Sequence, residues 1–111
     1  MCKDVFVYSK EEIDAFDRLI IALCRDYGRR RRLIEEADIS RRVRMELVYL
    51  NGKIFDAAAE ACGVHLAEIF IKEIGNSIGY AHSEAAYMSE GTYKAYKNLA
   101  KRNIVKKLYL E

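Results

Sequence analysis

Apolar residues recur at helical spacing along the first third of the chain. Their spacing of three and four positions predicts an amphipathic helix. The residues of this stripe are Ile13, Phe16, Ile20, Leu23, Cys24 and Tyr27. Ser9 followed by Glu12 is a capping-box pattern and marks the helix start. Gly28 is one predicted end, but Arg31 and Ile34 continue the stripe in phase. A single helix from about 9 to 36 is therefore the alternative.

The strongest periodicity lies in the middle of the chain. Its apolar residues follow at steps of three and four and define one face, formed by Val43, Leu47, Leu50, Ile54, Ala58 and Cys62. Asn51-Gly52 is a turn-forming pair, yet the stripe passes through it in phase. We therefore predict a continuous helix from about 40 to 62, capped by Asp38 or Ser40 and closed by Gly63. We expect residues 43, 47, 50, 54 and 58 to be buried.

The remaining segments complete a helical protein. We predict a helix over His65–Ile74, a loop over 75–79, a short helix over Tyr80–Tyr87 and a final helix capped by Ser89. Residues 1–8 favour an extended arm. The predicted fold is all-α, with residues 1–111 forming one domain, a bundle of four to six helices.

Composition supports this fold class and a soluble location. The chain has no proline and six glycines, with 51% hydrophobic and 32% charged residues. These values are not those of a disordered or membrane-spanning chain. The N-terminus lacks the apolar stretch of a signal peptide, so we expect a cytoplasmic protein that does not enter a membrane.

No combination of residues predicts catalysis. Three cysteines without short paired spacing do not form a disulfide framework. Cys62 and His65 have a spacing found in metal sites, but a second pair of ligands is missing. We therefore expect no enzyme activity, no cofactor and no metal.

Charge is nearly balanced but unevenly placed. The net charge is +2, while Arg25–Arg44 and Glu90–Glu111 each carry an excess of four positive charges. Such zones suit phosphate contacts, although a solvated helix face would have the same composition. The candidate DNA-binding residues of the first zone are Arg29, Arg30, Arg31, Arg32, Arg41 and Arg42.

The segment Tyr49-Leu50-Asn51-Gly52, followed by Phe55 to Val64, has the small-residue spacing of a helix-turn-helix. It resembles the helix-turn-helix in the fourth region of bacterial sigma factors and in phage-type activators. Ala59, Gly63, Val64 and Ile69 stand at the mutual spacing that such motifs prefer. The resemblance implies a recognition helix over His65–Ile74, presenting Glu68, Phe70, Ile71, Lys72 and Glu73. Ile54 and His65 replace the usual serine or threonine caps.

The final helix is a second candidate for contact with DNA. Its hydroxyl groups, tyrosines and lysines could meet phosphates and base edges. The candidate residues are Thr92, Tyr93, Lys94, Lys97 and Lys101.

Two functions follow as hypotheses. The first is a small DNA-associated regulator of the sigma-like, helix-turn-helix type, and the chain as a whole resembles short helical proteins of Gram-positive bacteria and mobile elements. The alternative is a homo-oligomeric helical adaptor or scaffold without DNA binding. Helices of this length in so short a chain need a partner to cover their apolar faces, so a homodimer or larger symmetric oligomer is expected in either case. We expect it to be built from the N-terminal helix and the tyrosine-bearing C-terminal helix.

Overall fold

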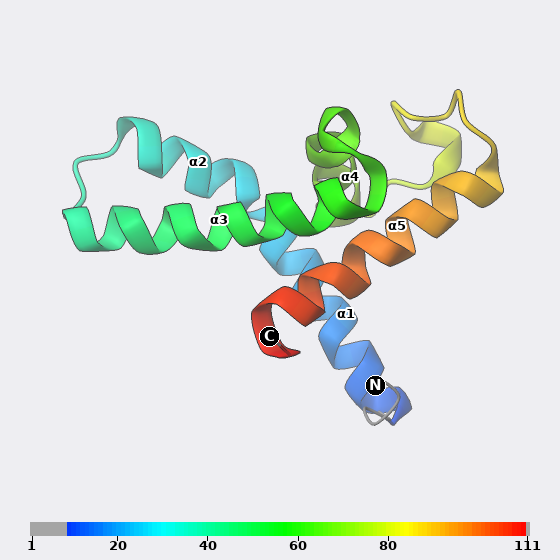
Figure 1. The fold of residues 1–111 in the computed structure, drawn as a ribbon, viewed down its shortest axis with the longest axis horizontal. Helices are drawn as coiled ribbons and strands as arrows, with labels where there is room; N and C mark the ends of the chain where they lie inside the picture. Colours follow the sequence, from blue (N-terminus) through cyan, green and yellow to red (C-terminus); the bar gives the residue numbers. More distant parts are fainter. Residues whose placement is uncertain (1–8, 111) are drawn as a thin grey trace.

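The computed structural model describes residues 9–110, which form five α-helices and no strand (Figure 1). The all-α prediction is confirmed. The helices are α1 (Lys10–Arg25), α2 (Tyr27–Glu36), α3 (Arg41–Cys62), α4 (Val64–Gly75) and α5 (Glu90–Val105), with a 3-10 turn η2 (Tyr80–His82) and a terminal π-helical turn η3 (Lys106–Leu110). The predicted arm over residues 1–8 lies outside the described residues.

The first helix begins as predicted but ends elsewhere. The Ser9 hydroxyl accepts the Glu12 amide at 3.1 Å, and the Glu12 carboxylate accepts the Ser9 amide at 2.8 Å, completing the capping box. The chain then turns at Asp26, so the predictions of an end at Gly28 and of one helix to 36 are both wrong. The turn places α1 against α4 and α2 against α3, and Gly28 lies inside α2.

The long central helix is continuous, as predicted. The Ser40 hydroxyl caps α3 by accepting the Val43 amide, and Gly63 ends the helix at a φ of +93°, a backbone conformation that favours glycine. The predicted burial is only partly correct. Ile54 and Ala58 are buried, whereas Leu47 and Leu50 are half-buried and Val43 is exposed. Only the C-terminal half of α3 lies in the core, because its N-terminal half has α2 alone beside it (Figure 1).

The fourth helix is the most buried element. Ala67, Phe70, Ile71 and Ile74 are all buried, and α4 packs on α1 and α3. Gly75 was expected in a loop but is the last residue of α4, where it touches the end of α1. A Cβ atom on Gly75 would lie 2.5 Å from the Arg25 backbone nitrogen. The absence of a side chain therefore permits this helix contact.

A buried carboxylate fastens the segment between α4 and α5. Glu73 accepts hydrogen bonds from the Ser83 hydroxyl at 2.6 Å, the Glu84 amide at 2.8 Å and the Tyr93 hydroxyl at 2.8 Å. The predicted helix over Tyr80–Tyr87 is a single 3-10 turn followed by non-helical turns. These side-chain bonds replace the backbone bonds that a helix would supply.

The helices form a body and a projecting arm (Figure 1). In the body, α4 and α5 pack on the C-terminal half of α3, and α1 packs on α4 and α5. We call α2 and the N-terminal half of α3 (Arg41–Leu50) the arm. The radius of gyration of 14.7 Å exceeds the roughly 13 Å of a compact chain of this length. None of the helices within residues 9–110 is long and apolar enough to cross a membrane.

The contact at Gly75 gives a stability prediction. Gly75→Ala should lower the free energy of unfolding by about 1–3 kcal/mol, because the added methyl group overlaps backbone that cannot move aside. Urea unfolding followed by circular dichroism measures the change. Gly28→Ala is the matched control, since a Cβ atom there meets open space inside a helix. This control should leave stability unchanged or raise it slightly, by at most about 0.5 kcal/mol, because Gly28 lies in the first turn of α2. Equal effects of the two substitutions would contradict the packing described.

Candidate interaction surface on the helical arm

A buried arginine joins the arm to the body. The Arg30 side chain is only 8% exposed, and its guanidinium donates to the Leu23 carbonyl at 2.6 Å and to the Asn51 side-chain oxygen at 2.6 Å. The Asn51 amide group in turn donates to the Tyr27 carbonyl at 3.1 Å. Arg30 and Asn51 thus satisfy backbone carbonyls at the turn between α1 and α2 and tie both helices to α3. Burial lowers the pKa of the Arg30 guanidinium from its ordinary value.

A second arginine fixes the far end of the arm. Arg44 on α3 donates to the carbonyl oxygens of Ile34 and of Ala37, the latter at 3.1 Å. These groups lie at the C-terminal end of α2, where helix carbonyls lack partners within the helix and a cation is favourable. The arm is therefore held by polar contacts at both ends, with little apolar core between its two helices.

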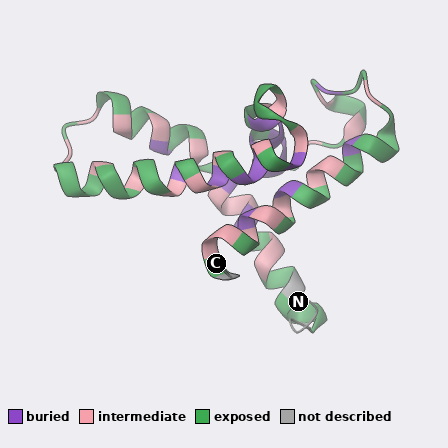
Figure 2. Ribbon diagram, viewed as in Figure 1, coloured by how far each residue is buried: buried purple, intermediate pink, exposed green. Residues whose placement is uncertain are grey.

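The side of α3 turned away from α2 carries large apolar side chains in solvent. Met45 is 60% exposed, Val48 49% and Tyr49 65%. Figure 2 shows the N-terminal half of α3 as mostly exposed. A shallow hollow on this side is lined by Arg41, Arg42, Met45, Glu46 and Tyr49. We call the residues that share this side the outward face: Arg41, Met45, Val48, Tyr49, Gly52 and Asp56.

Sequence reasoning missed the outward face although a signal for it was present. Met45, Val48, Tyr49 and Gly52 repeat at steps of three, one and three, which is a second stripe on the side of the helix opposite Leu47, Leu50 and Ile54. A helix that is apolar on two sides either is buried or binds a partner. Only the stripe that continues into the core was used to predict burial.

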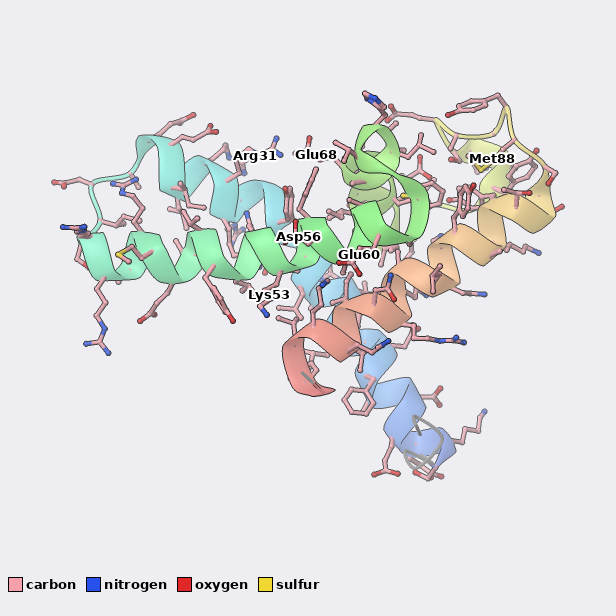
Figure 3. The ribbon with its side chains drawn as sticks, viewed as in Figure 1. Arg31, Lys53, Asp56, Glu60, Glu68 and Met88 are labelled. Atoms are coloured by element: carbon pink, nitrogen blue, oxygen red, sulfur yellow. The ribbon has the colours of Figure 1, made fainter. Side chains whose placement is uncertain are left out.

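The six arginines predicted to contact DNA do not form one set. Arg30 is buried and uses its donors inside the protein, so its assignment to a DNA surface is wrong. Arg31 forms an ion pair with Glu68 and lies over the Tyr27 ring (Figure 3). The remaining four arginines are exposed: Arg29, Arg32, Arg41 and Arg42. Arg42 forms a surface ion pair with Glu46.

The predicted contacts on α5 are mostly occupied within the protein. Tyr93 is 1% exposed, packs on Phe70 and bonds to Glu73, so its assignment as a base-contacting residue is wrong. The ammonium group of Lys97 donates to the Ile78 carbonyl at 2.6 Å, and Lys101 pairs with Asp17 at 3.1 Å. Two candidates are exposed and bond locally: Thr92 with the Ser89 cap, and Lys94 with Glu90 one turn away.

The helix-turn-helix expectation fails at its recognition helix. Of the five residues that α4 was expected to present, Phe70, Ile71 and Glu73 are buried. Glu68 and Lys72 are exposed but pair with Arg31 and with Glu84. Side chains that pack in the body cannot reach base edges in a DNA groove. The two basic zones also lie on different parts of the molecule, one on the arm and the other on α5 (Figure 1).

Within residues 9–110, the structure shows neither a cluster of metal ligands nor an activated thiol. No group of three or more histidine, cysteine or acidic side chains within residues 9–110 is placed to hold a metal ion. Burial raises the pKa of Cys24 to about 12 and that of Cys62 to about 11, so neither thiol is activated as a nucleophile. A hollow beside α4 is charged, but its ion pairs Arg31–Glu68 and Lys72–Glu84 are internal.

Comparison with known proteins identified no relatives. No protein-family model, no curated protein and no solved structure matches this chain. The resemblance to sigma-factor helix-turn-helix segments therefore stays a prediction.

The joint of the arm gives a second stability prediction. Arg30→Met should lower the free energy of unfolding by about 1–3 kcal/mol, because it leaves the Leu23 carbonyl and the Asn51 side-chain oxygen without their donor. Arg29→Met is the control, since Arg29 is exposed one position earlier in the same helix, and should change stability by less than about 0.5 kcal/mol. Thermal or urea unfolding of the two variants decides the point. If Arg29→Met lowers the free energy of unfolding as much as Arg30→Met does, the Arg30 contacts are not what joins the arm to the body.

Proposed function

We propose that the protein is a self-associating helical scaffold whose arm joins it to another copy. The observation that carries the proposal is the exposure of Met45, Val48 and Tyr49 together on one side of a projecting helix. Removing such side chains from water is favourable by roughly 1–2 kcal/mol each when they are about half exposed at the start. A contiguous apolar stripe with a charged rim is typical of a protein interface.

The charges around the stripe support a protein partner over a phosphate backbone. Charges of both signs occur along α3, with Arg42 and Glu46 in one pair and Lys53, Asp56 and Glu60 further along the helix (Figure 3). DNA attracts a surface of one sign, whereas a mixed rim suits a protein surface of similar composition.

The arm replaces the helices first expected to associate. Tyr93 on α5 is buried against Phe70, and Tyr96 is half-buried in the same cluster, so these tyrosines stabilise the monomer. This proposal places the apolar surface used for assembly on α3, where Met45, Val48 and Tyr49 are each about half exposed or more.

Self-association can be tested on two exposed tyrosines. Light scattering at tens of micromolar should give twice the mass of one chain for the wild type and one chain's mass for Tyr49→Glu, because a charge on the stripe is costly to bury. Tyr87→Glu is the matched control: Tyr87 is 76% exposed on the segment before α5 and lies off the arm. It should keep the wild-type mass. A monomeric wild type at these concentrations would refute the proposal.

Duplex DNA is the second candidate partner, favoured by the four exposed arginines of the arm: Arg29, Arg32, Arg41 and Arg42. Contacts of this kind bind phosphates without reading sequence. A DNA-associated regulator of this type would use the arm alone, since three of the five predicted contact residues of α4 are buried and the lysines of α5 lie elsewhere.

Salt dependence tests this second candidate. If the arm binds DNA, the logarithm of the affinity should fall with the logarithm of salt concentration by about 0.9 per phosphate contact. Arg29→Ala with Arg32→Ala should flatten the slope by about two contacts, whereas Lys94→Ala on α5 should not change it. Fluorescence anisotropy with a mixed-sequence duplex measures both. Absence of binding at low salt, or binding that does not respond to salt, would exclude DNA.

A further inference from the structure

We infer that the outward face of α3 pairs with the same face of a second copy in antiparallel orientation, with Arg41 opposite Asp56 and Met45 opposite Gly52. The inference rests on the proposed self-association and specifies how the two chains meet. Its evidence is the order of charged, large and small residues along this one side of α3.

The two ends of the outward face carry opposite charges. Arg41 and Asp56 are exposed, and the side chain of neither forms a hydrogen bond or an ion pair with another of the residues 9–110. Antiparallel pairing brings the Arg41 end of each helix to the Asp56 end of the other, so the twofold symmetry creates two attractive pairs. Parallel pairing would place like charges beside each other.

The same register matches the sizes of the apolar residues. Arg41 precedes Met45 by four residues, and Gly52 precedes Asp56 by four. Placing Arg41 opposite Asp56 of the second copy therefore also places Met45 opposite Gly52. Met45 then faces a residue without a side chain, and Val48 faces Tyr49 across the centre. The steps of four, three and four residues from Arg41 through Met45 and Val48 to Gly52 are those of a coiled-coil seam.

Gly52 has no packing reason within the monomer. A Cβ atom placed on it meets nothing within 4 Å, although glycine weakens the interior of a helix. Close approach of a neighbouring helix is one of the main uses of a glycine at such a place. In the antiparallel pair, Gly52 receives the long Met45 side chain of the second copy.

The shape of the molecule also favours this orientation. The body lies around the C-terminal half of α3, while the N-terminal half projects with α2 on its other side (Figure 1). Antiparallel arms keep the two bodies at opposite ends of the pair. Parallel arms would bring both bodies to the same end.

Charge reversal tests the register. Arg41→Asp and Asp56→Arg should each raise the dissociation constant of the dimer about tenfold, because symmetry turns two attractive pairs into two repulsive ones. The double variant should return to within about threefold of the wild type, since each reversed residue again faces an opposite charge. Sedimentation velocity over a dilution series measures all four proteins. If the double variant weakens the dimer by the combined effect of the two single variants, the register is wrong.

Gly52→Leu provides an independent readout. The side chain has open space in the monomer, so at concentrations below the dissociation constant the variant should unfold at the same or a higher temperature than the wild type. The same side chain would collide with Met45 of the second copy, and the dissociation constant should rise at least tenfold. A dimer of unchanged affinity would overturn the pairing of Met45 with Gly52. If the wild type dimerises and none of these substitutions changes its dissociation constant, self-association stands and the register alone is refuted. If the wild type stays monomeric, the proposed function is refuted as well.

Discussion

The contact between Arg30 and Asn51 is the interaction on which the rest of the structure depends. Arg30 bonds to the end of α1, and Asn51 bonds to the start of α2 while sitting in the middle of α3. A buried cation is tolerated here because its donors meet a carbonyl oxygen and an amide oxygen. The contact directs α2 away from the line of α1 and against α3. The N-terminal half of α3 then has α2 on one side and the outward face on the other.

Periodicity predicted the parts of the fold that bury apolar side chains. The continuity of α3 through Asn51-Gly52, its end at Gly63 and the cap of α5 at Ser89 all follow from local patterns. The break at Asp26 could not be predicted in this way, since it depends on Arg30 reaching a residue of α3 that lies 21 positions later. An arginine within a run of four is indistinguishable by composition from its exposed neighbours.

The candidate site was predicted least well, because surface function was inferred from charge alone. The zones of positive charge contained Arg30 and Lys97, whose charged groups bond to backbone or side-chain groups inside the protein, and Tyr93, which belongs to the core. The outward face depends on which side of α3 remains uncovered, a property that requires the position of α2. Once that position is known, the exposed stripe, its end charges and Gly52 form one pattern.

The most direct measurement of the central claim is the methyl resonance of Met45 during dilution, compared with that of Met88. Met45 lies on the outward face, whereas Met88 is half-buried near the start of α5, on a different part of the molecule (Figure 3). The account predicts that the Met45 signal of a methionine-methyl-labelled sample shifts as the protein is diluted through the dissociation constant, while the Met88 signal stays fixed. A Met45 signal that does not respond to concentration, or a shift at Met88 alone, would contradict the account.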